Sequence, residues 1–573
     1  MGGRSFQRIL VANRGEIAIR IIRTIKTLGL VAIAVYETTD KDAYFLRFAD
    51  TAIHIGEGPN KDYLDIKKII NAAKTSGADA IHPGSGFLSE SAEFARACEQ
   101  NDIVFIGPSS DILETLGTKT VAKKIASSVN IQTISGTEAI IPDEQGFNTA
   151  KAFVAKHGYP ILVKATAGGG GIGIRRIESD AELNLCILSA STEAMHAFGD
   201  ERIYIEKCIA RPKHVEVQIL ADCYGNIVHL GTRDCSIQRR HQKLIEVAPA
   251  NLPASVLESI QSAAVKIAKE AKYTNAGTVE FLVDADTHEF WFMEVNARLQ
   301  VEHTITEMLT EIDIVEQQIK IAEGRKLTLQ QEHVVLNGVA IEVRINAEDP
   351  KNNFMPDGGK FIEAYQLPGG PGIRVDSAIY KGYRIPTCYD SLLAKLIVKG
   401  YQWDQTVQRL KRSLSDFIII WPKTTIPLYI AMCDETDFKS RDFRTDYIEK
   451  HSQLFNYQET EYYVLDGSIY KTNSFDDTNF VAKNKEAKQA LSPQAADSIA
   501  THENVKSTIK GRVVNLLVEM GEEVEAGNVL IELEAMKMHT FVSASSDGRV
   551  IDILVEDGDS VDVDDILIIL EQR

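Results

Sequence analysis

The chain has 573 residues, of which 44% are hydrophobic and 25% are charged. This length is too great for one hydrophobic core, so we expect about three folded units, one of which could be a separate tail module. The composition excludes a collagen-like or wholly disordered protein. The net charge of −19 disfavours a general nucleic-acid binder or an anionic-membrane binder, because phosphate contacts need a cationic surface.

The cysteines and the apolar runs indicate the cellular compartment in which the protein resides. The seven cysteines are scattered and contain no C-x-x-C pair, which disfavours a disulfide framework and a zinc site. No run approaches the roughly 18 apolar residues of a membrane span, and no signal-peptide hydrophobic region is visible near the start. We therefore expect a cytoplasmic protein.

The first forty residues predict a strand, a helix and a second strand. Ile9 to Val11 are apolar, isoleucines then recur at helical spacing from Ile17 to Ile25, and Val31 to Val35 form another apolar run. Such a unit predicts a parallel sheet covered by helices. Its first turn reads Asn-Arg-Gly-Glu and not G-x-G-x-x-G, so a Rossmann dinucleotide site is disfavoured. A later strand is expected at Ile103 to Gly107.

A glycine-rich loop lies between two predicted strands, Ile161 to Ala165 and Ile174 to Ile177. A P-loop would open a helix and end in Gly-Lys-Ser/Thr, so this loop is of another kind. Its backbone N–H groups could fold over phosphates, although a mobile surface hairpin is the alternative. The glycines concerned are Gly168, Gly169, Gly170, Gly171 and Gly173.

Further strands follow, then a helical stretch from Thr304 to Gly324 and a third block that ends near Lys450. Residues 451–503 are polar and are expected to form a linker. Within it, YYVLDGSIYK has Asp-Gly between two β-type runs and predicts a hairpin.

The last seventy residues contain an internal repeat. GRVVNLLVEMGEEVEAGNVLIELE, from Gly511, matches GRVIDILVEDGDSVDVDDILIILE, from Gly548, at about half of its positions, and both copies alternate apolar and polar residues. Two equivalent sheets stacked as a flattened barrel are therefore predicted. Residues 504–573 hold 6 basic and 15 acidic residues, so this unit has about half of the excess negative charge.

Between the two copies lies Glu534-Ala535-Met536-Lys537-Met538. This segment resembles the biotin attachment site of biotin carboxyl carrier domains. A lipoyl domain has the same fold, but an acidic residue and alanine usually flank its lysine, so Met536 and Met538 favour biotin. The resemblance implies that a biotin protein ligase attaches biotin to Lys537.

Residues from Phe6 to about Lys450 resemble biotin carboxylase, an ATP-grasp enzyme. The resemblance implies an α/β protein with an N-terminal domain (1–118), an ATP-grasp domain (119–330) and a C-terminal domain (331–450), followed by the linker (451–503) and an all-β carrier domain (504–573). It also implies that ATP, Mg²⁺ (or Mn²⁺) and bicarbonate give carboxyphosphate, whose CO₂ is taken up by biotin.

The segment from Glu294 to Glu302 has the strongest local chemistry. Its alternation predicts that Glu294, Asn296, Arg298, Gln300 and Glu302 share one face of an extended segment. Five inward polar residues would be costly without a site to serve; a salt-bridged surface strand is the alternative.

Oxygen ligands suit Mg²⁺, and a guanidinium fork suits bicarbonate. We expect Mg²⁺ at Glu280, Glu294 and Asn296, and bicarbonate at Arg298 with Gln300 and the Val301 backbone beside it. Glu302 is expected to be the base that deprotonates bicarbonate. The resemblance implies that Arg344 stabilises the enolate of deprotonated biotin.

Other positions resemble the nucleotide site of the family. Lys119 and Lys164 would neutralise phosphate oxygens, and the backbone at Glu206, Lys207 and Ile209 would read adenine. The remaining positions are His214 on the ribose side, Gln238 and His241 at the nucleotide, and Lys243 near carboxyphosphate. The cationic run from Ser236 to Lys243 is expected to form a loop. Solvated lysines and a structural histidine are the alternatives.

The chain departs from the family pattern at three positions: Ser85 where an aromatic residue is common, Ile172 where a cation is common, and Thr304 where proline is usual. Two other functions therefore stay open. One is an ATP-grasp ligase that joins a carboxylate to an amine, and the other is a catalytically inactive carrier or scaffold.

The sequence has no room for a carboxyltransferase, so we expect one as a partner (β) subunit. The domain order resembles α subunits of acyl-CoA carboxylases, which favours acetyl-CoA or propionyl-CoA as the final acceptor, with pyruvate or another 2-oxo acid as the alternative. We also expect self-association through the biotin carboxylase part, and neither a nucleic-acid nor a membrane partner.

Overall fold

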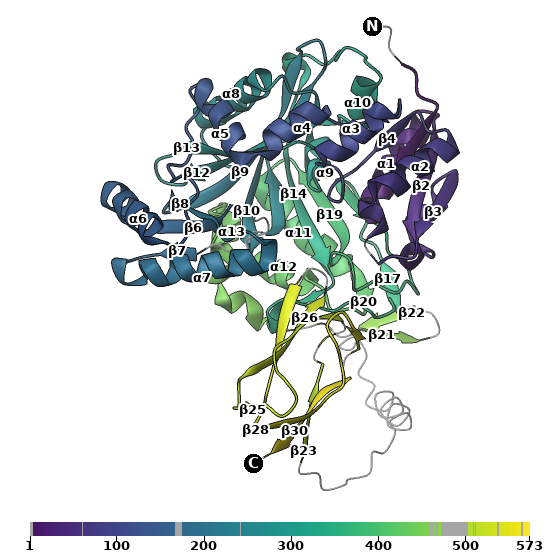
Figure 1. Cartoon of the computed structure of the whole chain (residues 1–573). Coiled ribbons are helices and arrows are strands. Elements are labelled where there is room, and N and C mark those ends of the chain that lie inside the picture. Colours follow the sequence, from purple (N-terminus) through teal and green to yellow (C-terminus); the bar gives the residue numbers. More distant parts are fainter. Residues whose placement is uncertain are drawn as a thin grey trace.

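The computed structural model describes residues 4–59, 61–166, 175–240, 242–458, 460, 462–465, 468–471, 502–507, 509, 511–535, 538–562 and 565–572. Residues 4–458 are called the front unit below, and residues 502–572 the carrier domain. The front unit forms the upper body in Figure 1, and the carrier domain lies below it. Among the described helices, none is both long and apolar enough to cross a bilayer.

The chain begins with a parallel sheet covered by helices, as predicted. Its strands lie in the order β3-β2-β1-β4-β5, and the side chains of Ile17, Ile21 and Ile25 are buried on one face of α1. The expected strand at Ile103 to Gly107 is shorter, at two residues. The elements are β1 (Arg8–Val11), α1 (Gly15–Thr27), β2 (Val31–Glu37), β3 (Thr51–Gly56), α2 (Ile66–Ser76), β4 (Ala80–His82), α3 (Ala92–Gln100), β5 (Val104–Phe105), α4 (Ser110–Gly117) and α5 (Lys119–Ser128).

A small lobe with its own apolar cluster follows. Its three strands lie in the order β7-β6-β8. The glycine loop, with Gly168, Gly169, Gly170, Gly171, Ile172 and Gly173, falls outside the described residues. The elements are α6 (Glu144–His157), β6 (Ile161–Ala165), β7 (Arg175–Ile177), α7 (Asp180–Phe198) and β8 (Ile203–Lys207).

An eight-stranded sheet, in the order β13-β12-β9-β10-β11-β14-β19-β18, forms the centre of the front unit. Neighbouring strands in it pair antiparallel. Its strands and attached helices are β9 (Pro212–Ala221), β10 (Ile227–Arg239), β11 (Gln242–Ala248), α8 (Ala254–Glu270), β12 (Asn275–Asp284), β13 (Phe290–Asn296), α9 (His303–Thr310), α10 (Ile314–Ala322), β14 (Val339–Asn346), β18 (Ile373–Ser377) and β19 (Leu392–Gly400).

Two predictions for this region are wrong in detail. The run from Ser236 to Lys243 is not a loop, because β10 continues to Arg239 and returns as β11, and Gln238 pairs with Lys243 across the hairpin. The helical stretch from Thr304 to Gly324 is two helices, since Glu311 takes a left-handed conformation that ends α9.

Smaller elements complete the front unit. They are β15 (Glu348–Asp349), β16 (Met355–Pro356), β17 (Ala364–Gln366), α11 (Trp403–Asp416), β20 (Ile418–Ile420), α12 (Ile426–Met432), α13 (Thr436–Ser440), α14 (Tyr447–Lys450) and a 3₁₀ turn, η6 (Ser452–Asn456). Beyond them, β21 (Tyr462–Leu465) pairs antiparallel with β22 (Ser468–Lys471), as the Asp-Gly turn predicts.

The carrier domain is the predicted sandwich of two sheets. Their strand orders are β23-β30-β28-β25 and β27-β26-β24-β29. The repeat is visible in the pairing, because β24 joins β26 in one sheet as β28 joins β30 in the other. The strands are β23 (His502–Lys506), β24 (Gly511–Leu516), β25 (Glu523–Val524), β26 (Val529–Ala535), β27 (Met538–Ser543), β28 (Gly548–Ile553), β29 (Ser560–Val561) and β30 (Ile566–Gln572).

Candidate active site

A cavity of about 730 Å³ lies in the front unit, lined by the first βα turn, the small lobe and the central sheet. Most of the predicted site residues line it: Lys119, Lys164, Lys207, Ile209, His214, Gln238, Lys243, Glu280, Glu294, Asn296, Arg298, Gln300, Val301, Glu302 and Arg344. The side chain of Glu206 lies buried beside the cavity. His241 and Lys537 fall outside the described residues, as do the loop glycines.

Lys243 is the centre of the charge network in this cavity. Its Nζ lies 2.6 Å from Glu216 Oε2, 2.9 Å from Glu280 Oε1 and 2.6 Å from Glu302 Oε1. Arg344 Nη2 donates to the other oxygen of Glu302 at 3.0 Å, and Arg344 Nε donates to Glu246 Oε1 at 2.8 Å. The two cations therefore hold both oxygens of Glu302 in place.

The same cations set the ionisation of Glu302. Burial alone would raise the pKa of Glu302, but the charges of Lys243, Arg344 and Arg233 outweigh it and hold this pKa well below its ordinary value. Glu302 is therefore a carboxylate at neutral pH, which is the form that can accept a proton.

Arg233 supports this network from within the central sheet. Its guanidinium is fully buried and bonds Glu216, and its Nη2 donates to Gln300 Oε1 at 2.8 Å. Gln300 Nε2 in turn donates to Glu280 Oε1 at 2.9 Å. Arg233 thus fixes the orientation of Gln300 and of a carboxylate that contacts Lys243.

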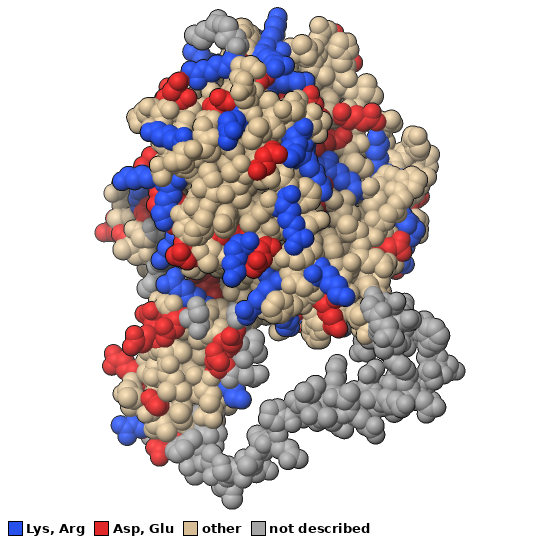
Figure 2. Space-filling model, turned by 90° about the vertical axis from the view of Figure 1, so that its right-hand side faces the viewer, with Lys and Arg blue, Asp and Glu red and all other residues tan. Residues whose placement is uncertain are grey.

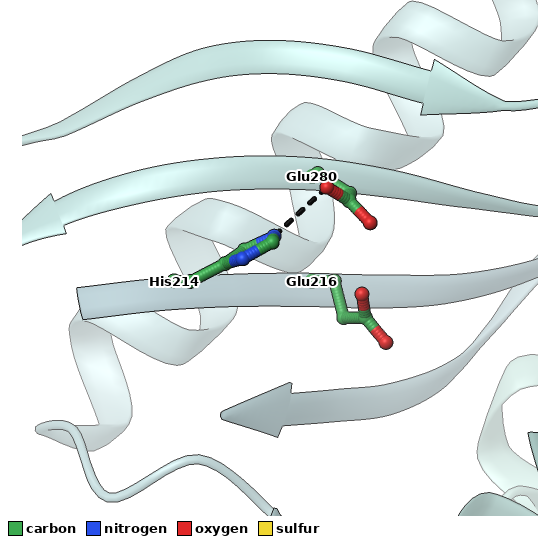
Figure 3. Close-up of side chains that lie close together, drawn as sticks. All are labelled: His214, Glu216 and Glu280. Atoms are coloured by element: carbon green, nitrogen blue, oxygen red, sulfur yellow. Dashed lines mark hydrogen bonds and ion pairs between the residues drawn. The ribbon is translucent and has the colours of Figure 1, made fainter. Parts of the chain in front are cut away.

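Glu280 and Glu294 are direct cross-strand partners on β12 and β13. Figure 3 shows Glu280 facing His214 across neighbouring strands, with His214 Nε2 2.8 Å from Glu280 Oε2. Burial alone would lower the pKa of His214, but Glu280 outweighs it and raises this pKa. The imidazole of His214 is therefore paired with a carboxylate, and apolar residues are not its only neighbours.

The carboxylate pair fits a hard cation. Burial and the neighbouring Glu280 raise the pKa of Glu294, and the ion pair that its carboxylate makes is a long one, 3.8 Å from Lys119 Nζ. The amide oxygen of Asn296 lines the same cavity. Mg²⁺ prefers oxygen donors, and among the described residues Glu294 has no close cation to neutralise it, so Glu294 would hold the ion together with Glu280 and Asn296.

Arg298 points into the cavity although strand β13 ends before it, at Asn296. Its guanidinium is held by Glu90 Oε2 at 2.8 Å, by Asn296 Oδ1 at 3.0 Å and by Ser85 Oγ at 3.3 Å.

The predicted alternation of cavity-facing and outward-facing residues is incomplete, because Val301 lines the cavity together with its neighbours Gln300 and Glu302. The carbonyl of Val301 accepts from Lys395 Nζ at 2.7 Å.

Lys164 is paired in this structure. Its Nζ donates to Glu206 Oε2 at 2.7 Å, and Lys123 bonds the other oxygen of Glu206. Burial would raise the pKa of Glu206, but these two lysines lower it. The Glu206 side chain therefore orients lysines, and the adenine contact expected of its backbone remains a prediction.

The sequence interpretation missed Glu216, Arg233, Glu246 and Glu90. A signal for Glu216 was present, because His214, Glu216 and Gln218 alternate along β9 in the same way as the residues after Glu294. Glu90 lies in a turn more than 200 positions before Arg298, and no local pattern connects the two.

Four families match the chain. Residues 5–113 match "Biotin carboxylase, N-terminal domain", residues 118–330 match "Carbamoyl-phosphate synthase L chain, ATP binding domain", residues 342–450 match "Biotin carboxylase C-terminal domain" and residues 503–570 match "Biotin-requiring enzyme". Biotin carboxylase 1 of Bacillus subtilis is 47% identical over 450 residues, which are 78% of this chain and 99% of that protein. The chain belongs to the biotin carboxylase family.

Solved structures agree with this family. The biotin carboxylase domain dimer of the 2-oxoglutarate carboxylase from Hydrogenobacter thermophilus, in complex with MgADP, ADP and bicarbonate, is 46% identical with a TM-score of 0.76, over 80% of this chain and 100% of that chain. Biotin carboxylase from Campylobacter jejuni, in a β-γ-ATP complex, is 43% identical with a TM-score of 0.74, over 78% and 99%.

These findings confirm the expected family, the order of its domains along the chain and the requirement for biotin and ATP. Two of the noted departures have structural roles here. Ser85 contacts Arg298, and the hydroxyl of Thr304 donates to Glu342 Oε2 at 2.5 Å. Proline at position 304 could not make the second contact, because it has no side-chain donor.

Proposed function

We propose that this chain uses ATP and bicarbonate to carboxylate biotin on its own carrier domain. The observation that carries the proposal is the arrangement of Lys243, Glu302 and Arg344, in which two cations grip one buried, ionised carboxylate inside the cavity. A site of this kind can bind a small anion and accept its proton.

Bicarbonate would bind at the fork of Arg298, beside Gln300 and the Val301 backbone. Its negative charge competes with Glu302 for Lys243, and Lys243 lies 2.6 Å from that carboxylate. When Lys243 turns toward bicarbonate, the pKa of Glu302 rises, because part of its counter-charge is withdrawn. Glu302 then accepts the bicarbonate proton.

The deprotonated bicarbonate oxygen attacks the γ-phosphorus of ATP. An O–P bond forms, the bond between the β- and γ-phosphates breaks, and carboxyphosphate and ADP result. Lys119 and Lys164 would neutralise phosphate oxygens. Mg²⁺ bound at Glu280, Glu294 and Asn296 would supply further positive charge there. Arg344, 3.0 Å from Glu302, would hold biotin at the side of the cavity where CO₂ is released.

The test is ADP release by the purified chain with free biotin as the acceptor. We expect release to require both bicarbonate and biotin, and to fall sharply in Glu302→Gln. ADP release that an amine and a carboxylate substrate support without bicarbonate would favour the ATP-grasp ligase instead. ATP binding without turnover would favour the inactive scaffold.

Lys537 is proposed as the biotinylated residue. The match of residues 503–570 to "Biotin-requiring enzyme" supports this site. After co-expression with a biotin protein ligase, intact-mass measurement should give one biotin-sized addition. Its persistence in Lys537→Arg would contradict the assignment.

For the final acceptor we propose acyl-CoA, with acetyl-CoA or propionyl-CoA as the substrate of a partner carboxyltransferase. The carrier domain fused after the carboxylase supports this choice through its resemblance to acyl-CoA carboxylase α subunits. The names of two relatives favour a 2-oxo acid. They are the small subunit of 2-oxoglutarate carboxylase from Hydrogenobacter thermophilus, 46% identical, and one of the subunits of pyruvate carboxylase from Methanothermobacter thermautotrophicus, 45% identical.

Label transfer would distinguish the two acceptors. The chain carboxylated with radioactive bicarbonate is added to host extract depleted of this chain, together with propionyl-CoA, acetyl-CoA, pyruvate or 2-oxoglutarate. Label on an acyl-CoA supports the proposal, and label on a 2-oxo acid contradicts it.

Two partners are also proposed. Both relatives are named as subunits, which supports a partner carboxyltransferase, and the dimer in the solved relative supports self-association of the carboxylase part.

A further inference from the structure

The short hairpin formed by β15 and β16 lies next to the cavity. Glu348 pairs with Pro356, and Asp349 pairs with Met355. Glu348 Oε1 accepts from Asn346 Nδ2 at 3.2 Å and also from Ser391 Oγ, and both Asn346 and Ser391 line the cavity. Glu348 therefore anchors the hairpin that carries Met355 to two residues of the cavity wall.

The turn of this hairpin has an unusual backbone. Asn353 and Phe354 both have positive φ values, 50° and 58°, and such a conformation is rare for a bulky residue and strained. The Phe354 ring, which is 2% exposed, packs edge-on against Phe455 at a centroid distance of 6.0 Å. Packing beneath the hairpin therefore holds this turn in place.

Arg239 ties the hairpin to the active site. Its guanidinium carbon lies 4.3 Å from the centroid of the Phe354 ring, and its Nη2 donates to Asn353 Oδ1 at 3.1 Å. Arg239 ends strand β10, directly after the cavity residue Gln238. The strand that supplies the nucleotide site thus also fixes the position of Met355.

Met355 contacts the carrier domain. Its side chain packs against the apolar core of the sandwich, and Thr540 Oγ1 donates to Met355 Sδ at 3.5 Å. Thr540 lies on β27, three positions after Lys537 in the sequence, and β27 pairs with β26. In Figure 1 the end of the sandwich that carries the β26 label is turned toward the front unit. The contact is therefore made near the segment that carries Lys537.

We propose that Met355, presented by the β15–β16 hairpin, is the docking residue that receives the carrier domain of this chain at the cavity. The proposal rests on the proposed function and adds the surface to which the carrier domain binds. A methionine suits this role, because its flexible, polarisable side chain adapts to an irregular apolar surface. Among the described residues, Met355 is the front-unit side chain that packs on the carrier core, and a small contact of this kind is typical of transient association, as a carrier that must leave again requires.

The test compares two reactions of the full-length chain. The first is the rate at which the biotinylated chain takes up acid-labile radioactive label from bicarbonate onto its own biotin. The second is ADP release by the unbiotinylated chain with free biotin, which needs no docking. Met355→Asp should slow the first reaction about tenfold, equivalent to roughly 1.4 kcal/mol, and leave the second unchanged. Tyr401→Asp, at a side chain that is 80% exposed, is the matched control and should change neither.

A second pair of variants tests the contact from both sides. Thr540→Asp should slow self-labelling as Met355→Asp does, and Met355→Lys combined with Thr540→Asp should restore part of the rate by charge complementarity. Unchanged self-labelling in Met355→Asp would overturn the docking proposal while the proposed function stands. An equal fall in both reactions would also overturn it, since the hairpin would then support the active site itself. Absence of free-biotin turnover in the wild-type chain would remove the proposed function and the docking proposal together.

Discussion

The front unit and the carrier domain differ in where they put their charges. The front unit buries Arg233 and Lys395 completely, each paired with a carboxylate. The core of the carrier domain, as far as the structure describes it, consists of aliphatic residues such as Leu530 and Leu533, with Ser507 as its buried polar side chain. In Figure 2 most of the charged side chains on the carrier domain are acidic, whereas the front unit shows lysines and arginines interspersed with acidic side chains.

The two regions therefore support function in different ways. Removing charges from water costs free energy that pairing only partly offsets, so the network around Lys243 holds the reacting groups at the expense of stability. The carrier domain has a conventional apolar core, and its proposed function depends on one lysine and on the surface around it. Changes to buried charge should therefore affect the chemistry, and changes to the carrier core should affect delivery alone.

The largest effect is expected for Glu302→Gln. Loss of a general base typically costs about 100- to 10,000-fold in rate, and the amide oxygen of the substituted side chain could still accept a hydrogen bond from Lys243. The measurement is bicarbonate-dependent ADP release with free biotin, with the nucleotide dissociation constant as the control. Wild-type turnover, or loss of nucleotide binding in parallel, would remove Glu302 from the role of base.

Arg233→Met tests the cost of breaking the buried network. It removes one of the two cations that contact Glu216, and Lys243 remains as the other, so we expect a loss of about 3 kcal/mol, the lower end of the range for breaking a buried ion pair. The free energy of unfolding of the front unit, from urea titration, should fall by this amount.

Arg202→Met is the matched control for Arg233→Met. Arg202 is paired with Asp200 at 2.7 Å, but its side chain is 61% exposed, and pairs of this kind contribute roughly 0–1 kcal/mol. Equal losses in the two variants would show that burial of the charge does not decide its contribution.

Leu533→Ala tests whether the two regions are independent. The Leu533 side chain is fully buried in the carrier core, and such truncations cost about 2–5 kcal/mol. Unfolding of the carrier domain should shift and self-labelling should fall, whereas free-biotin turnover should stay at the wild-type rate. Leu517→Ala, at a side chain that is 48% exposed, is the control. A loss of free-biotin turnover in Leu533→Ala would mean that the front unit depends on a folded carrier.

The sequence predicted those parts of the molecule whose pattern is local. The repeat from Gly511 and Gly548 predicted the sandwich because each copy carries its own period of two. The alternation from Glu294 brought Mg²⁺ and bicarbonate candidates to one cavity, although strand β13 itself stops at Asn296.

The rest depends on residues far apart in the sequence. Arg239 belongs to the run that the sequence predicts to be a loop, because nothing next to it shows that Phe354 and Asn353 lie beside it. The contact between Met355 and Thr540 joins positions 185 residues apart. Such contacts follow from how the sheets pack, and a single sequence contains no signal of them.

The last effect builds up gradually with pH and concerns the buried Glu342. Burial raises its pKa to about 8, and its cross-strand neighbour Glu246 adds to the shift against the opposing charge of Lys395. The folded chain therefore keeps a proton on Glu342 that the unfolded chain loses near pH 4.5. Stability contributed by this group is complete at low pH and falls as the pH rises through this window, by about 1.4 kcal/mol per pH unit.

Glu342→Gln should remove this slope. The difference in the free energy of unfolding of the front unit between the variant and the wild type should grow from about pH 5 to about 8 and then level off. Thr304→Val should extend the slope to higher pH, because the hydrogen bond from Thr304 lowers the pKa of Glu342. A difference that does not change with pH would mean that Glu342 is ionised in the folded chain. Lys395 would then be its effective partner, and the buried network would hold one more ion pair than the geometry assigns to it.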